Sequence, residues 1–235
     1  MPADAALAAR FKIFDATIAG MNRRLGRVRT GEQMMGALRW GRDELDRVYA
    51  ATPAKVLATV ACRAGCDACC HVPVDVQAHE VFFAADHMQV HFPPAELDAA
   101  LTRLAAHRRR VAAFGVGERD TSRQPCALLV TGSCSVYAGR PQPCRSHHAS
   151  DATTCAGHRD DPTVDISQVY VPALRARMFA VMLGVDESLE AHGYDERAYD
   201  FGSALHEALT NSLCLARWLR RGAAFPDSCL ADPAG

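Results

Sequence analysis

The first twenty-five residues carry their apolar side chains at alternating steps of four and three. These positions are Leu7, Phe11, Phe14, Ile18, Met21 and Leu25. Such spacing places side chains on one face of an α-helix, so the pattern predicts an amphipathic helix that buries this face. Thr30 followed three residues later by Gln33 is typical of a helix start and predicts a second helix through Val48. We expect the two helices to pack as an antiparallel hairpin.

Four further helices are predicted later in the chain, and only one pair of strands. Residues 76–90 and 96–114 have helical character, and Pro172 suits the first turn of a helix that continues through Met182. A last helix is predicted from about Ser203 to Arg220. Its buried face would carry Leu205, Leu209, Leu213 and Ala216. Two short apolar runs on either side of Thr131-Gly132-Ser133 predict a small β-hairpin.

This order of elements shows no alternation of strands and helices of the kind that a parallel sheet needs. We therefore expect a mainly α protein that forms a single domain over residues 1–235. Residues 1–61 and 165–222 are predicted to form a helical bundle. The bundle would clamp a central cysteine-rich, metal-binding lobe at about residues 62–155, with at most a small β-hairpin.

Composition and charge narrow the range of partners. The 235 residues carry a formal net charge of −1, so no overall field would attract nucleic acid or an anionic membrane, and we expect neither as a partner. The consecutive arginines 108–110 are expected on a solvated helix face. No apolar run approaches the ~18 residues that span a bilayer, and residues 1–25 lack the apolar core of a secretion signal. A cytoplasmic location is expected.

The chemistry of the chain is concentrated in its cysteines. Eight of the ten lie in one segment: Cys62, Cys66, Cys69, Cys70, Cys126, Cys134, Cys144 and Cys155. Cytoplasmic thiols stay reduced, so these residues indicate ligands rather than disulfides. Thiolates are soft ligands that select zinc, copper(I) or iron–sulfur clusters, and we predict all eight as metal ligands. Cys214, on an apolar helix face, and Cys229 are expected to take no part.

Charged neighbours of the cysteines are further candidates. Arg140 and Arg145 flank Cys144 and are predicted to bind the cofactor. They could lower thiol pKa values, bind an anionic substrate or balance the negative charge of a cluster. His71, His147 and His148 also lie beside cysteines; each could be a metal ligand or could orient a thiolate, and the sequence leaves this open. His79-Glu80 lacks the second histidine of a zinc-protease helix, so no site is predicted there.

These motifs resemble a known family. The run from Cys62 to His71, the pair Pro125-Cys126 and the run from Gly132 to Arg145 resemble the bacterial cysteine-cluster family, CxxCxxCC, described as a zinc- or iron-chelating domain. Tyr137, Arg140 and Pro141 fit the same pattern. The resemblance covers roughly Cys62 to Cys155, and its first gap has three residues where the family pattern has two. It implies a bound metal ion or cluster and does not imply one particular reaction.

Three functional classes remain open at this point. Flagellin lysine methylases are similar over the cysteine region, which suggests by analogy an iron–sulfur-dependent transferase linked to S-adenosylmethionine. The spacing Cys62-x3-Cys66-x2-Cys69 also resembles the radical S-adenosylmethionine motif, but the chain lacks the strand–helix units of that family's barrel. The other two classes are a zinc module that displays a surface to a protein partner and a metal carrier or sensor. Eight thiolates exceed the needs of one structural zinc and favour a cluster.

Overall fold

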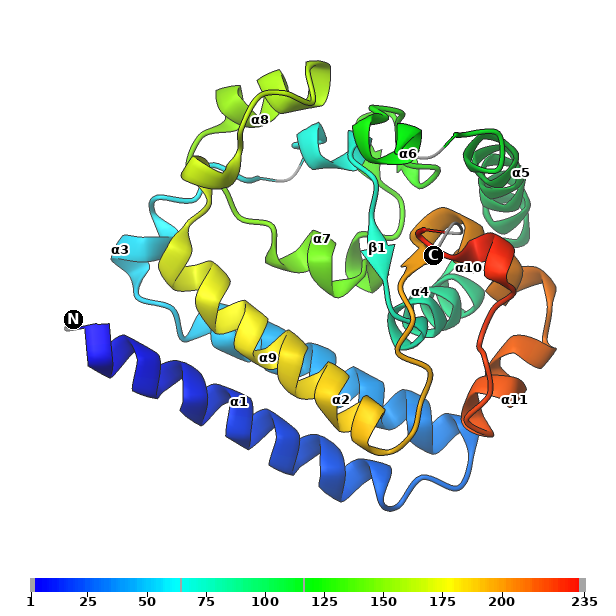
Figure 1. Ribbon diagram of the computed structural model, residues 1–235, viewed down its shortest axis with the longest axis horizontal. Coiled ribbons are helices and arrows are strands. Elements are labelled where there is room, and N and C mark those ends of the chain that lie inside the picture. The colour runs from blue at the N-terminus through cyan, green and yellow to red at the C-terminus, as the bar shows by residue number, and fades with distance from the viewer. Residues whose placement is uncertain (1–2, 64, 116, 233–235) are drawn as a thin grey trace.

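A computed structural model describes residues 3–63, 65–115 and 117–232. These residues form eleven α-helices, four short 3-10 segments and two antiparallel pairs of very short strands (Figure 1). The prediction of a mainly α protein is therefore confirmed. None of the described helices combines the length and the apolar content that a membrane crossing requires.

The elements follow one another along the chain in a clear order. The long and short α-helices are α1 (Ala3–Leu25), α2 (Gly31–Ala50), α3 (Ala54–Leu57), α4 (Ala78–His91), α5 (Pro94–Val111), α6 (Glu118–Thr121), α7 (Gln142–Ser146), α8 (Ala152–Asp160), α9 (Pro172–Ala191), α10 (Phe201–Thr210) and α11 (Leu213–Leu219). The 3-10 segments are η1 (Ala68–His71), η2 (Tyr137–Gly139), η3 (Ser167–Val169) and η4 (Asp227–Cys229). The strands are β1 (Asp75–Val76), β2 (Leu129–Val130), β3 (Ser133–Cys134) and β4 (Tyr199–Asp200).

The helices α1, α2 and α9 pack against one another along one side of the molecule (Figure 1). Gly184 of α9 allows the close approach of α1, because a Cβ atom there would lie 2.8 Å from the Cβ of Thr17. Thr30 caps α2 as predicted, and its hydroxyl accepts a hydrogen bond from the Gln33 amide at 3.2 Å. The side chain of Gln33 reaches one residue further back and accepts from the Arg29 amide at 2.7 Å.

The predicted buried face of α1 is only partly buried. Met21 and Leu25 are in the core, whereas Leu7 and Phe11 are 46% and 57% exposed. The expectation was wrong for these two residues because the first turns of α1 project beyond the neighbouring helices (Figure 1). Helical spacing shows which residues share a face, but it does not show how far along the helix a partner extends.

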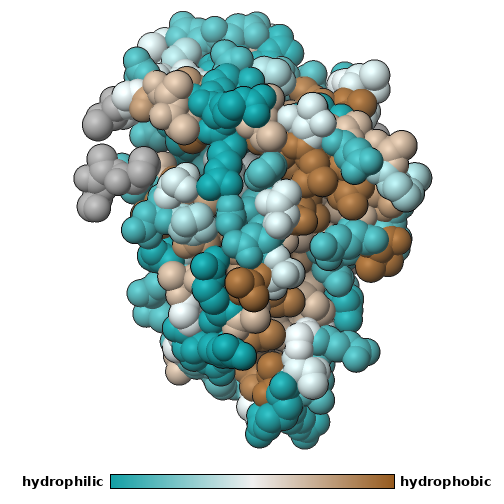
Figure 2. Space-filling model, turned by 90° about the vertical axis from the view of Figure 1, so that its right-hand side faces the viewer, coloured by the Kyte–Doolittle hydropathy of each residue, from teal (hydrophilic) through white to brown (hydrophobic). Residues whose placement is uncertain are grey.

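The last predicted helix is in fact two helices, α10 and α11. Asn211 leaves the helical conformation, and its side-chain oxygen accepts a hydrogen bond from the Leu213 amide at 3.1 Å. An asparagine side chain that bonds to nearby backbone competes with the helix, which explains the break. Leu213 was expected on the buried face, but it is 64% exposed. On this side of the molecule hydrophobic residues reach the surface between polar areas (Figure 2).

The predicted hairpin is present, and a second pair of strands accompanies it. β2 and β3 pair in antiparallel fashion, with Leu129 opposite Cys134. Thr131 and Gly132 form the turn at φ angles of 48° and 75°, as a tight two-residue hairpin turn requires. The other pair joins β1 to β4, with Val76 opposite Tyr199, and is too short to leave an alternating pattern in the sequence.

Two helices that lie within the cysteine-rich part of the sequence pack with the other long helices. α4 contacts α2 and α10, and α5 contacts α10. We call α1, α2, α4, α5, α9, α10 and α11 the helical scaffold. We call residues 58–76 and 124–170, which hold the clustered cysteines on short elements, the cysteine lobe (Figure 1). The chain therefore leaves the lobe to form α4 and α5 and then returns to it.

Candidate metal centre

The eight predicted ligands lie on short elements of the cysteine lobe. Cys62 and Cys66 precede η1, Cys69 and Cys70 are in η1, Cys126 precedes β2, Cys134 is in β3, Cys144 is in α7 and Cys155 is in α8. All eight are free thiols and partly exposed. Cys214 and Cys229 are fully buried in the hydrophobic core, as expected for residues that take no part in the site.

Backbone contacts bring the cysteine segments together. Gly65 has a φ of 82°, in the left-handed region that glycine tolerates best, and this turns the chain between Cys62 and Cys66. The Cys126 amide donates a hydrogen bond to the Cys70 carbonyl at 2.7 Å. The helix α8, which carries Cys155, packs against η1. Segments far apart in the sequence therefore meet around η1.

Electrostatic effects on the thiols show a first group of neighbours. Burial raises the pKa of the Cys62 thiol, and the proximity of Cys66 and Cys69 raises it further. Burial also raises the pKa of Cys155 to about 11, and Cys62, Cys66 and Cys69 again add to the effect. These four side chains, from the loop, η1 and α8, therefore lie within electrostatic reach of one another.

A second group of thiols also includes Cys69. Burial raises the pKa of Cys126 to about 11, with smaller contributions from Cys134 and Cys69. Burial likewise raises the pKa of Cys144, and Cys126, Cys69 and Cys134 add to it. Cys69 itself shares a hydrogen bond with Cys70, which is the main cause of its raised pKa. Cys69 is thus the thiol that both groups have in common.

The thiols lie near one another, but they are not arranged as a metal coordination shell. Across the described parts of the chain, no three histidine, cysteine, aspartate or glutamate side chains form an array that could hold a metal ion. The raised pKa values keep the buried thiols protonated at neutral pH, and a metal would have to displace those protons. Small rotations of the cysteine side chains would have to accompany binding.

A cavity of about 320 Å³ lies between three thiols of the first group and α7. Four cysteines line it: Cys62, Cys66, Cys69 and Cys144. Its other polar lining residues are mostly cationic or aromatic: Arg63, Arg140, Arg145, His147, His148, Tyr49, Tyr137 and Asp46. A zinc ion held directly by four sulfurs leaves no such space between its ligands. The cavity is therefore larger than one structural zinc ion needs.

The two predicted cofactor-binding arginines have different surroundings. The Arg140 guanidinium lies 3.9 Å from the centre of the Tyr137 ring and lowers thiol pKa values on both sides of the site. The thiols on which it acts are Cys62, Cys69, Cys134 and Cys144. The Arg145 side chain is only 10% exposed, and it forms an ion pair with Asp46 of α2. Arg140 therefore acts directly on the cysteines. Arg145 instead connects α7, which carries Cys144, to α2 of the scaffold.

Two of the three candidate histidines face the cavity. The His148 ring stacks on Tyr49 with 5.2 Å between ring centres, and the His147 ring meets Tyr170 edge-on at 5.1 Å. Burial and then the charge of Arg175 lower the pKa of His147 to about 4, so its imidazole is neutral. His71 is placed differently, because its Nδ1 lies 3.2 Å from the Asp67 carbonyl oxygen of the same loop.

One wall of the cavity comes from α2 and was not identified from the sequence. Asp46 and Tyr49 line the cavity, and Arg42, which precedes Asp46 by one helical turn, donates a hydrogen bond to the Ala138 carbonyl of η2. The spacing of four and three residues places these three polar side chains on one face of α2. That polar stripe was the available signal, but polar stripes usually face solvent, so it did not single out a site.

Glu80 has a structural role in the site that its motif did not predict. The carboxyl group is buried, and one oxygen accepts a hydrogen bond from the Gln142 amide at 2.8 Å. The other oxygen accepts from the Gln77 amide, also at 2.8 Å. Glu80 therefore joins the N-terminal ends of α4 and α7, and α7 carries Cys144. The nearby His79 Nε2 lies 2.7 Å from the Gln142 side chain and strengthens the same junction.

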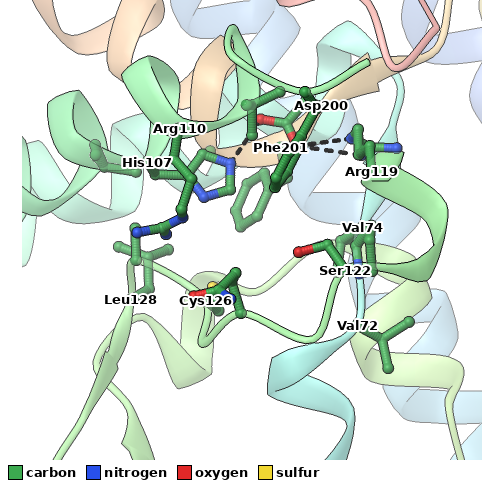
Figure 3. Close-up of a pocket in the computed structure, with 17 residues that line it drawn as sticks. Val72, Val74, His107, Arg110, Arg119, Ser122, Cys126, Leu128, Asp200 and Phe201 are labelled. Atoms are coloured by element: carbon green, nitrogen blue, oxygen red, sulfur yellow. Dashed lines mark hydrogen bonds and ion pairs between the residues drawn. The ribbon is translucent and has the colours of Figure 1, made fainter. Parts of the chain in front are cut away.

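Cys126 also lines a second pocket, which lies between α5, α6 and the β1–β4 pair (Figure 3). Asp200 is the centre of its hydrogen-bond network and is 3% exposed. It accepts hydrogen bonds from His107 at 2.8 Å, from Arg119 at 3.1 Å and from the Ser203 amide at 2.8 Å. None of these residues was predicted, because they come from four elements that are distant in sequence.

Comparison with known proteins bears on this geometry. Residues 61–163 match the model of the CxxCxxCC family, whose description is "Putative zinc- or iron-chelating domain". The matched segment contains all eight clustered cysteines, and it confirms the resemblance found in the sequence motifs. No curated protein and no solved structure matches the chain. The match therefore supports metal binding by this part of the chain.

Proposed function

We propose that this CxxCxxCC domain holds an iron–sulfur centre through its clustered thiols. The observation that carries the proposal is the cavity of about 320 Å³ lined by Cys62, Cys66, Cys69 and Cys144. Iron–sulfur clusters are bound by four thiolates and occupy the space between them, whereas four-coordinate zinc lies in direct contact with its ligands. The donor set and the size of the cavity both suit a cluster.

The charge around the cavity supports the same assignment. A cluster bound by four thiolates is an anion, and buried anions need nearby positive charge. Arg140 supplies that charge to thiols of both groups, and Arg63 lines the cavity beside Cys62. When bound, a cluster would supply one-electron transfer or an open iron site. The chain itself would hold the cluster, shield it and balance its charge.

The remaining thiols extend the site. Cys126 and Cys134 are near Cys144, and Cys70 is hydrogen-bonded to Cys69. Eight thiols in two groups that share Cys69 exceed the four that one cluster uses. We propose that the four thiols outside the cavity, Cys70, Cys126, Cys134 and Cys155, belong to a second metal position or replace a ligand during exchange. His147, which is neutral, and His148 are available as additional donors in the same cavity.

The S-adenosylmethionine-linked transferase remains the less favoured alternative. Within the described residues the only strands are two antiparallel pairs of two residues each, so neither a doubly wound sheet nor a parallel barrel is present there. A transferase on this chain would need another way to bind the cofactor. A zinc module that contacts a protein partner is the other alternative, and it predicts a colourless protein.

The test is anaerobic purification of the full chain, followed by metal and sulfide analysis and a visible spectrum of the same sample. We expect several irons per chain, a similar amount of inorganic sulfide and a broad visible absorption. The variant Cys69→Ser should lose most of the iron, while Cys214→Ala, which removes a thiol from the core, should keep it. A colourless wild-type protein that contains only zinc would overturn the proposal.

A further inference from the structure

The second pocket, behind Cys126, has features of a ligand site that the metal centre does not explain. Its volume is about 50 Å³, and it is closed mostly by apolar side chains (Figure 3). These are Val72, Val74, Leu104, Val111, Leu128 and Phe201. An apolar pocket with a few convergent polar groups is the usual form of a small-molecule site.

His107 presents a free nitrogen to this pocket. Its Nε2 is 2.8 Å from Asp200, and its Nδ1 is buried without a hydrogen-bond partner. Figure 3 shows the ring with Asp200 on one side and the interior of the pocket on the other. A buried polar atom without a partner costs free energy, so a group that bonds to Nδ1 would be favoured here.

Asp200 is an ionised carboxylate that fixes the orientation of the His107 ring. Burial alone would raise the pKa of Asp200, but the hydrogen bond with His107 and the charge of Arg119 together hold it well below its usual range. The carboxylate is therefore ionised, and His107 Nε2, Arg119 and the Ser203 amide all bond to it. This holds the His107 ring with its Nδ1 directed away from Asp200.

Arg110 supplies the second polar group. The three consecutive arginines of α5 were expected on a solvated face, yet they differ: Arg108 pairs with Glu207 at 2.7 Å, Arg109 is exposed and Arg110 lines the pocket. Arg110 forms no ion pair or hydrogen bond with any described residue. Figure 3 places its side chain beside His107 and above Leu128. Its guanidinium is therefore available to an acidic ligand.

We propose that this pocket binds a small amphipathic carboxylate, such as a short-chain fatty acid. The carboxylate would accept hydrogen bonds from the Arg110 guanidinium beside His107, and the short carbon chain would lie against the apolar walls. Arg119 already balances the charge of Asp200, so the charge of Arg110 is free for the ligand. The hydroxyl of Ser122 points into the same space (Figure 3) and could bond to the second carboxylate oxygen.

The pocket and the metal centre share one residue, which gives the ligand a route to influence the centre. Cys126 lines the pocket and belongs to the second thiol group. A ligand in the pocket would exclude water from this side of Cys126 and thereby alter its surroundings. Binding of the carboxylate does not depend on the identity of the metal, so this proposal stands or falls separately from the iron–sulfur proposal.

The test is calorimetric titration of the purified full-length protein with propionate, butyrate, hexanoate and the neutral analogue butyramide. We expect saturable binding of propionate or butyrate, and binding of butyramide weaker by at least about tenfold. Hexanoate should bind less well, because its chain exceeds the pocket. Arg110→Met should weaken butyrate binding by about tenfold or more, whereas Arg109→Met, next to it on the same helix, should leave it unchanged.

A variant that fills the pocket tests the need for free space separately from the need for positive charge. Ser122→Leu keeps Arg110 and His107 but fills the space beside them, and it should abolish butyrate binding. The melting temperature and metal content of each variant show whether it is folded. Absence of saturable binding to any of the acids in the wild-type protein, or equal losses in Arg109→Met and Arg110→Met, would overturn the proposal.

Discussion

Cys214 and Cys69 show how differently two regions of this chain are built. Cys214 is fully buried in the scaffold, in the same core cluster as Trp218 and Phe225. Cys69 is in the cysteine lobe, where its electrostatic neighbours are other thiols and Arg140. The same side chain is a small hydrophobic residue in one place and a candidate ligand in the other. Position in the fold, rather than residue type, decides between these roles.

The same contrast holds for the two regions as wholes. The scaffold buries large apolar side chains completely, among them Met34, Leu45, Met88, Leu174 and Leu205. The lobe consists of helices and strands of two to nine residues, and its fully buried apolar side chains are few. Burial of apolar area stabilises the scaffold by itself. The lobe lacks that source of stability, so we infer that bound metal supplies a large part of its stability.

Removal of the metal should give the largest effect. Complete chelation should lower the free energy of unfolding by about 4 kcal/mol, as expected for a ligand present far above its Kd. For a chain of this size that corresponds to a fall in Tm of roughly 8–16 °C. Hydrogen exchange should show where the loss occurs. Residues 58–76 and 124–170 should exchange faster in the metal-free protein, while α2, α4 and α9 stay protected.

A uniform increase in exchange along the chain would contradict this division, because it would mean that the scaffold also depends on the metal. An unchanged Tm after complete metal removal would contradict it more strongly. The comparison requires measured metal contents before and after chelation, so that incomplete removal is not mistaken for stability.

The next largest effect should distinguish Cys69 from Cys214 directly. Cys69→Ser removes the thiol that both groups share and should cost most of the bound metal, with a fall in Tm close to that of the chelated protein. Cys214→Ala should cost about 1 kcal/mol, since it leaves a small cavity in the core, and should leave the metal content unchanged. Metal analysis and thermal unfolding of both variants check the pair. Equal metal contents would rule out the shared role of Cys69.

Glu80 lies at the junction of the scaffold and the cysteine lobe. Its carboxyl group should make the stability of the protein depend on pH. Burial, and then the charge of Asp186, raise the pKa of this carboxyl to about 8, against an ordinary value of 4.5. Between these pH values the folded state binds more protons than the unfolded state, so this group lowers stability as the pH rises. The substitution Glu80→Gln removes the titrating group and with it this loss of stability at higher pH. Relative to wild type, the variant should gain at least about 2 kcal/mol between about pH 4.5 and 8, since each unit of pKa shift corresponds to about 1.4 kcal/mol.

The measurement is denaturant unfolding of both metal-free proteins across this pH range. The metal-free state is required because metal binding itself is expected to strengthen with pH, as the protonated thiols lose their protons. Asp186→Asn is the companion variant, because burial also raises the pKa of Asp186 to about 7. A stability difference between Glu80→Gln and wild type that does not vary with pH would show that Glu80 is already ionised in the fold.

Local patterns in the sequence predicted the local parts of this structure. Periodicity predicted α9 from Pro172, residue types predicted the Thr30 cap, and turn chemistry predicted the bend at Thr131-Gly132. The concentration of cysteines between residues 62 and 155 predicted a metal-chelating segment, and the family match supports this prediction. Each of these signals lies within a few neighbouring residues, where spacing and residue type act directly on the backbone.

The parts that could not be predicted depend on contacts between distant segments. The position of Cys69 between two groups of thiols, the link from Glu80 to Gln142 and the pairing of β1 with β4 all join residues more than fifty positions apart. The difference between Arg140 and Arg145 is of the same kind, because it depends on Asp46 of α2. No local pattern shows which distant side chain will be the neighbour.

The smallest effect tests the scaffold alone. Thr30→Ala removes the hydroxyl that accepts the Gln33 amide at the start of α2, and it should lower the free energy of unfolding by about 1 kcal/mol. Thr102→Ala, at an exposed site within α5, should be neutral or slightly stabilising because alanine is the better helix former. Both variants should keep the wild-type metal content. A loss of metal in Thr30→Ala would show that the lobe responds to small changes in the scaffold, and the two regions would then have to be treated as one cooperative unit.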